Sequence, residues 1–314
     1  MKPRHILAAC LFAPALFAQP LQPLDAFWFA EAGFLTADRL ETLTKELKDW
    51  KTAGVFDQYA WRSLPPTFED PKQFISLANS FHKTMGGHSL VASFPVGLEG
   101  WETSYNQKLA EQGGWKYDPA KAMSHKEWLA AFANLQAEQW AWVLERPAKM
   151  MTPEQAAQSA VELGRFAKAH GKKFVMWLST NGLRGPALAV TQAVCKATRG
   201  MADDFVWMDL PGDATIKALG HRPASGEEGR VSAGFLAALD GLLDEILELT
   251  PKEKVHIQWT HSPRLPTQNV EGTTAYIAAC QKKGINKFVL FAPLQLLAQE
   301  PWHDFYTKIP RSGR

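Results

Sequence analysis

The chain alternates between two hydrophobic patterns along most of its length. Short apolar runs rich in Val, Phe and Trp are typical of buried strands. Each is followed by a longer run with apolar residues every three or four positions, which is typical of a helix. This alternation constrains the fold more than any single motif, because strands that alternate with helices pair in parallel in one sheet. The predicted strands cover residues 27–31, 55–61, 89–96, 140–145, 174–179, 205–210, 255–260 and 288–292.

Eight strand-then-helix units predict an α/β fold of the (β/α)8 type, the TIM barrel. The alternative is an open, doubly wound sheet, which usually begins with a glycine-rich turn, and Glu-Ala-Gly-Phe at 31–34 is not such a turn. Thr152 before Pro153 predicts the start of a helix, and Gly171 and Gly284 predict two helix ends. The predicted helices cover residues 37–51, 70–84, 125–138, 153–170, 186–199, 232–249, 271–283 and 295–307.

The first residues have the order of a secretory signal. Residues 1–5 are basic, residues 6–17 are largely apolar, and the small Ala18 precedes Gln19. We therefore expect residues 1–18 to be a signal peptide and residues 19–314 to be a single barrel domain. The protein is then secreted or periplasmic.

Charge and hydropathy exclude two kinds of partner. The formal net charge is +2, and Lys2 and Arg4 carry that excess within the predicted signal. A chain without a basic excess is not expected to bind nucleic acid. No later apolar run is long enough to cross a bilayer, so no membrane partner is predicted after signal removal. The pattern predicts no oligomeric state.

Two predicted connections are longer than a compact barrel needs. Residues 97–123 follow the third predicted strand and carry Trp101, and residues 211–230 follow the sixth. Both leave the carboxyl ends of strands, where barrel enzymes place their sites. These extended loops after the third and sixth predicted strands are candidates for a substrate wall, and packing on the barrel rim is the alternative.

Common cofactor and metal motifs are absent from the sequence. It contains no Gly-x-Ser-x-Gly, His-Glu-x-x-His, Walker, Gly-x-Gly-x-x-Gly or Cys-x-x-Cys motif. We therefore predict no cofactor, and the function that we favour below requires no metal. Cys195 and Cys280 fall on predicted helices separated by another helix, so we expect two separate buried thiols.

Two carboxylates end predicted strands. In residues 205–210, alternation places Val206 and Met208 on one face, which we expect to meet the helices. Trp207 and Asp209 then point inward, where a carboxylate needs a partner or a function. Glu145 ends the fourth predicted strand and is a candidate nucleophile or general acid, an ion pair with a following basic residue being the alternative.

The remaining candidates bind substrate. Twelve tryptophans are many for this length, and an indole face stacks well on a sugar ring. Barrel packing explains some of them, and the best stacking candidates are Trp177 and Trp207, which alternate inward with Ser179 and Asp209. His261 either transfers a proton or orients a neighbour. The predicted substrate-binding residues are Glu31, Trp101, Trp177, Asn181, Trp207, Trp259 and His261.

With its export signal, strand-end acids and rim aromatics, the chain resembles the secreted (β/α)8 glycoside hydrolases in architecture. Some retaining members place one carboxylate after strand four and the other after strand six, and Glu145 and Asp209 match that placement by position. The resemblance implies hydrolysis of a glycosidic bond in a carbohydrate. Two alternatives stay open: a metal-dependent hydrolase or lyase using Glu31, Asp209 and His261, and a non-catalytic glycan-binding barrel.

Overall fold

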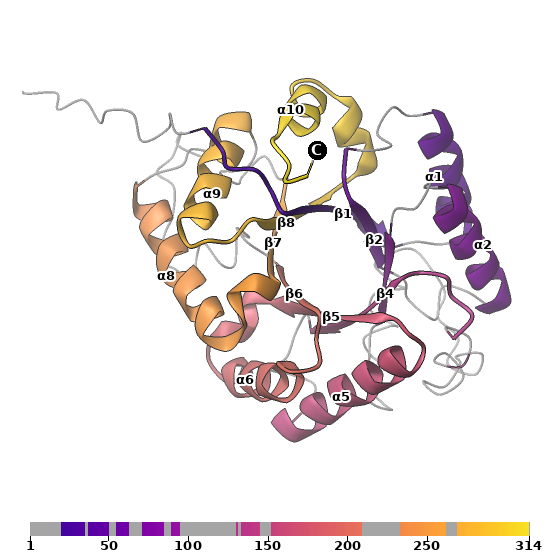
Figure 1. Ribbon diagram of the computed structural model, residues 1–314, viewed down its shortest axis with the longest axis horizontal. Helices are drawn as coiled ribbons and strands as arrows, with labels where there is room; N and C mark the ends of the chain where they lie inside the picture. The colour runs from indigo at the N-terminus through magenta and orange to yellow at the C-terminus, as the bar shows by residue number, and fades with distance from the viewer. Residues whose placement is uncertain are drawn as a thin grey trace, which may run out of the picture.

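The computed structural model describes residues 20–34, 37–49, 55–62, 71–84, 89–94, 130, 133–144, 152–208, 233–261 and 269–313. In these residues eight parallel strands pair in chain order, and the last pairs with the first, so the sheet is a closed barrel (Figure 1). The prediction of a (β/α)8 barrel is confirmed. The strands are β1 (Ala26–Phe34), β2 (Gln58–Arg62), β3 (Ser89–Phe94), β4 (Gln139–Leu144), β5 (Lys173–Ser179), β6 (Asp204–Met208), β7 (Val255–Thr260) and β8 (Lys287–Ala292).

The helices lie outside the ring of strands (Figure 1). Thr152 begins α5 with a capping box and Pro153 follows it, as predicted. Gly171 and Gly284 follow two helices with φ of 67° and 77°, which glycine adopts without strain. The described α-helices are α1 (Ala37–Asp49), α2 (Pro71–Thr84), α5 (Pro153–Ala169), α6 (Ala187–Thr198), α8 (Ala233–Leu249), α9 (Val270–Lys282) and α10 (Trp302–Lys308).

Closure depends on the pairing of β1 with β8. Six consecutive residues of β1, from Ala26 to Glu31, pair in register with Lys287 to Ala292. Every backbone donor and acceptor of these segments can then find a neighbouring strand, and no sheet edge is left along them. Because all the strands are parallel, their carboxyl ends meet at one rim of the barrel.

The apolar core has two shells. The outer shell lies between the strands and the helices, and it takes residues such as Phe27, Trp142 and Trp207. The inner shell fills the barrel itself. Alternation along each strand divides the side chains between the two shells, with successive residues facing opposite sides. The buried residues of the inner shell are Trp28, Ala30, Ala60, Ala141, Val175, Trp177, Val206, Met208 and Val289.

Two predicted helices differ from the structure. Residues 133–138, which we assigned to the helix at 125–138, form a turn and extended chain before β4. The predicted helix at 295–307 is divided into a short 3-10 helix, η6 (Leu294–Ala298), and α10. Pro301 explains the division, because proline donates no backbone hydrogen bond and disfavours helical backbone at the residue before it.

Other predictions lie outside the described residues. They are the signal peptide at 1–18 and the two long connections at 97–123 and 211–230. Within the described part of the chain, no helix combines the length and the apolar character that crossing a membrane requires.

Two helical glycines test the packing of the outer shell. A methyl group at Gly164 in α5 would collide with Met201 Sδ and lie 2.9 Å from Phe174 Cε1, whereas one at Gly241 in α8 would meet nothing within 4 Å. We expect Gly164→Ala to lower the free energy of unfolding by about 1–3 kcal/mol through overpacking. Gly241→Ala should raise it by up to about 1 kcal/mol through helix propensity. Urea unfolding measures both, and an equal gain in the two variants would contradict the close contact of α5 with β5.

Candidate functional site

The carboxyl ends of the strands define one rim of the barrel. β4 ends at Leu144 and β6 ends at Met208. Glu145 and Asp209 are therefore the next residues of the chain, and both lie outside the described residues. In the closed order of the strands, only β5 separates β4 from β6. The ends of β4 and β6, which precede the two candidate carboxylates in the sequence, thus lie near each other at the same rim.

β5 brings three polar or aromatic candidates toward this rim. Trp177 is 2% exposed and belongs to the inner shell, so its predicted inward orientation is confirmed. Ser179 ends the strand, and its Oγ accepts a hydrogen bond from the backbone N–H of Asn181 at 3.2 Å. This bond starts the 3-10 helix η3 (Thr180–Leu183) and leaves Asn181 exposed.

Apolar side chains from the even-numbered strands complete the described mouth. Val143 of β4 and Phe291 of β8 are partly buried and pack against the inner shell, and Met208 of β6 is buried within it. The described mouth is therefore largely apolar, with the exposed Asn181 just beyond the end of β5.

The predicted orientation of Trp207 is wrong. Its indole is fully buried in the outer shell, and its Nε1 donates to Thr250 Oγ1 at 3.3 Å. Val206 and Met208, which we expected to face the helices, fill the barrel instead. Alternation divides a strand into two faces but does not decide which is inner, and the larger indole packs beside the helices. The sequence argument that Asp209 points inward with Trp207 loses its support.

Trp259 also faces away from the barrel interior. It is fully buried in the outer shell, stacked on Phe27 at a centroid distance of 6.0 Å and edge-on to Phe288 at 5.5 Å. An indole enclosed in this way has no face left for a sugar ring. Trp207 and Trp259 are therefore packing residues in this structure, and Trp177 remains the described tryptophan of the predicted set that faces the interior.

His261 contacts α10. Its Nε2 lies 2.5 Å from Tyr306 Oη, and its ring centroid lies 4.0 Å from that of Trp302. Burial raises the pKa of Tyr306 well above its ordinary value, so the phenol stays protonated and can donate to the imidazole. These contacts support an orienting role for His261 rather than proton transfer.

The structure gives less information on two further predicted residues, Glu31 and Trp101. Glu31 lies within β1, in register with Ala292, and does not end the strand, which continues to Phe34 after a register shift. We expected β1 to end at Glu31, so that boundary is wrong. Trp101 lies outside the described residues.

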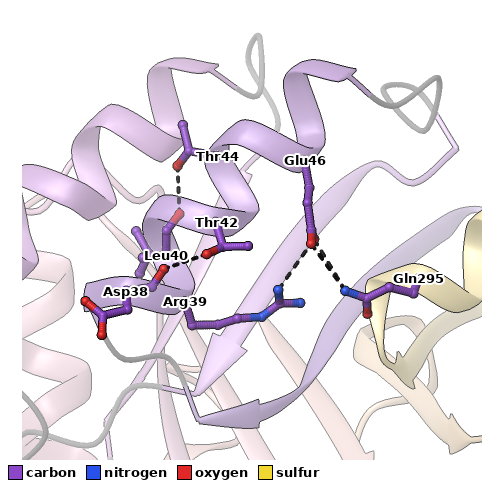
Figure 2. Close-up of polar contacts among 7 residues, drawn as sticks. All are labelled: Asp38, Arg39, Leu40, Thr42, Thr44, Glu46 and Gln295. Atoms are coloured by element: carbon purple, nitrogen blue, oxygen red, sulfur yellow. Dashed lines mark hydrogen bonds and ion pairs between the residues drawn. The ribbon is translucent and has the colours of Figure 1, made fainter.

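A polar contact beside the rim was missed by the sequence analysis. Figure 2 shows Arg39 and Gln295 converging on the carboxylate of Glu46. Arg39 Nη1 lies 3.5 Å from Glu46 Oε2, and Gln295 Nε2 lies 3.4 Å from the same oxygen. These long contacts link α1 to η6, which follow the adjacent strands β1 and β8. The residues are far apart in sequence, so no local pattern indicated the contact.

A second polar cluster lies at the opposite end of the barrel. Asp204 Oδ1 is 3.0 Å from His256 Nε2 and 3.2 Å from Lys287 Nζ. At the same end of the barrel, Gln139 Nε2 at the start of β4 donates to Gln58 Oε1 at the start of β2, at 2.8 Å. All five residues occupy the first inward positions of their strands, which is a signal that the sequence analysis could have used. Polar residues at the amino-terminal end of a barrel usually serve stability.

Burial sets the ionisation of this cluster. Burial lowers the pKa of His256, and the hydrogen bond to Asp204 offsets this only in part. Burial also opposes the charged form of Asp204, but the hydrogen bond from His256 and the charge of Lys287 hold the pKa of this carboxyl below its ordinary value. The native pair is therefore a neutral imidazole that donates to a carboxylate.

The described residues offer no metal site and no reactive thiol. Among the residues that the structure describes, no group of three His, Cys, Asp or Glu side chains could hold a metal ion. Cys195 and Cys280 are free and buried, as predicted. Burial raises the pKa of Cys195 to about 12 and also raises that of Cys280, so both are inert thiols at neutral pH.

A pocket of about 430 Å³ lies away from the rim. It is lined by α9 and α10 residues, including Val270, Phe305 and Lys308, together with Leu21. Its lining is largely apolar and contributes no group to the candidate site.

The comparisons with known proteins support the fold. No protein-family model and no curated protein sequence matches the chain. A GH18 chitinase from Pseudoalteromonas aurantia is 13% identical, with a TM-score of 0.52 over 89% of this chain and 98% of that chain. A family 18 chitinase from Crocus vernus is 10% identical, with a TM-score of 0.51 over 88% of this chain and 96% of that chain. The chain thus shares its barrel fold with glycoside hydrolases.

Acid should destabilise the protein through the Asp204–His256 pair. Both groups have a lower pKa folded than unfolded, so the unfolded chain binds more protons as the pH falls. We expect the free energy of unfolding to decrease below about pH 6.5, the ordinary pKa of histidine. Urea unfolding at several pH values should show a shallower decrease in His256→Gln.

The half-exposed His303 on α10 provides the matched control. His303→Gln should keep the pH dependence of the wild type. A wild-type stability that does not change between neutral pH and about pH 5 would contradict the assignment of a neutral, buried His256.

Proposed function

We propose that the protein hydrolyses a glycosidic bond at the carboxyl-terminal mouth of the barrel. The observation that carries this proposal is the position of two strand ends. β4 ends directly before Glu145, and β6 ends directly before Asp209. Two carboxyl groups that flank a sugar are the groups that this reaction requires in most glycoside hydrolases.

The two carboxyl groups have distinct roles in the proposal. Asp209 protonates the leaving oxygen as general acid, and Glu145 attacks the anomeric carbon or activates water. The roles are exchangeable, because each depends on the local pKa of the carboxyl group. No metal or cofactor takes part in this reaction.

The described mouth has the chemical character that a sugar needs. A sugar ring presents apolar C–H faces and a rim of hydroxyl groups. Val143 and Phe291 supply partly buried apolar surface, and the exposed Asn181 follows the end of β5. Barrel glycoside hydrolases share this fold, which is compatible with the proposal but does not carry it.

Paired carboxylate variants test the reaction. A panel of glycans is screened with the wild type for release of reducing sugar. On the glycan that is cleaved, Glu145→Gln and Asp209→Asn should each lower kcat by about 10²–10⁴ while unfolding at the wild-type temperature. Glu154→Gln and Asp240→Asn, on the exposed sides of α5 and α8, are the matched controls and should keep wild-type kcat.

Three outcomes would contradict parts of the proposal. Near-normal kcat in either strand-end variant removes that residue from the mechanism. Glycan binding without product release indicates a binding module. Activity that is lost to a chelator and restored by a divalent ion favours the metal-dependent alternative with Glu31, Asp209 and His261.

We further propose that residues 1–18 direct export. The basic start, the apolar run and Ala18 before Gln19 support cleavage after Ala18. Expression of the full chain in a bacterium should yield an exported protein whose mass corresponds to a first residue of Gln19. A chain that stays inside the cell with its first eighteen residues intact would overturn this proposal.

A further inference from the structure

The barrel interior holds an aromatic donor and an amide acceptor beneath the mouth. Trp177 belongs to the inner shell, and Gln258 lies between Ile257 and Trp259, which both face the outer shell. Alternation therefore turns Gln258 into the barrel. Each of the two side chains is 2% exposed.

The two side chains lie at the same height in the barrel. Trp177 of β5 pairs with Val206 of β6, and Val206 pairs with His256 of β7. Because the strands of such an eight-stranded barrel are tilted, residues at equal height are offset from the hydrogen-bonded pairing by one residue for each strand crossed. Gln258, two residues beyond His256, is therefore level with Trp177. Such a layer takes its side chains from alternate strands, so the two are neighbours within it.

Neither group has a hydrogen-bonding partner within the described part of the chain. Trp177 Nε1 has no acceptor, and Gln258 Oε1 has no donor. Buried polar groups in native proteins are almost always paired, so an unpaired donor beside an unpaired acceptor needs an explanation.

The position of the pair favours a ligand from the mouth. Val143 and Phe291 are the next inward residues toward the carboxyl end on β4 and β8, and both are partly exposed. The pair therefore lies one layer below the mouth. Ala30 of β1 lies in the same layer as Trp177 and Gln258, and its small side chain occupies little space there.

We propose that Trp177 Nε1 and Gln258 Oε1 bind one hydroxyl group of the carbohydrate substrate at the floor of the mouth. A hydroxyl accepts one hydrogen bond and donates another, so it satisfies both groups at once. A carbonyl oxygen would satisfy only Trp177, and an ammonium group would satisfy only Gln258. This inference rests on the proposed function, because it takes the ligand to be the glycan that is cleaved.

Two conservative variants test the pair. Gln258→Met removes the polar amide and keeps a side chain of similar shape, and Trp177→Phe removes the indole N–H and keeps a smaller aromatic ring. On the glycan that the wild type cleaves, each should lower kcat/KM about tenfold, the effect of one buried hydroxyl left without a partner. The unfolding temperature of Gln258→Met should stay equal or rise, because an unpaired buried polar atom has been removed. Trp177→Phe also leaves a cavity and should lower it.

Matched controls separate binding from folding. Gln139→Met breaks the buried bond to Gln58 at the other end of the barrel, and Trp142→Phe breaks the outward bond to Ser159. Both should lower the unfolding temperature and keep the wild-type kcat/KM. A fall in unfolding temperature for Gln258→Met, as large as that for Gln139→Met, would overturn the proposal in favour of a structural role.

Deoxy analogues of the cleaved glycan identify the hydroxyl. The wild type should lose about tenfold in kcat/KM on the analogue that lacks the bound hydroxyl, whereas Gln258→Met should show no further loss on it. If every analogue affects the two proteins equally, the floor pair binds no hydroxyl and this inference alone fails. If the wild type neither cleaves nor binds any glycan of the panel, the proposed function fails and the inference fails with it.

Discussion

The pairing of β1 with β8 is the interaction on which the rest of the structure depends. Their register, from Ala26 with Lys287 to Glu31 with Ala292, closes a sheet that would otherwise have two open edges. Closure of the barrel also determines where a functional site can lie. Once the ring is complete, the carboxyl ends of all the strands face one mouth, and residues that are distant in sequence become neighbours. The link between Glu46 and Gln295 in Figure 2 strengthens the same junction from outside.

Closure also gives the barrel interior two chemically different ends. The amino-terminal end is closed by polar groups that bond to one another, with Asp204 bonded to His256 and Gln139 bonded to Gln58. The second polar atoms of Gln58, Gln139 and His256 have no partner among the described residues. The carboxyl-terminal end combines partly buried apolar residues with Trp177 and Gln258, whose polar atoms have no partner among the described residues. The unpaired atoms of Trp177 and Gln258 lie one layer below the partly buried Val143 and Phe291, within reach of a ligand that enters the mouth. This position is the physical reason to look for substrate there.

The sequence predicted the barrel because eight repeats of one pattern leave few folds to choose from. It also predicted that Trp177 faces the barrel interior, because alternate residues of β5 were assigned to the correct faces of the strand. The same reasoning failed for Trp207, because a period of two does not reveal which face of a buried strand is inner. Pro301 divided a helix that periodicity alone joined, and the partners of Glu46 and Asp204 arise only from the closed topology. Glu145 and Asp209 stay predictions, because they lie outside the described residues.

The central claim is that a carbohydrate binds at the carboxyl-terminal mouth of the barrel. A crystal structure of Glu145→Gln soaked with the glycan that the wild type cleaves tests it most directly. We expect a sugar between the ends of β4 and β6, with one hydroxyl within hydrogen-bond distance of Trp177 Nε1 and Gln258 Oε1. A sugar bound elsewhere, such as in the pocket beside Val270 and Phe305, would contradict it.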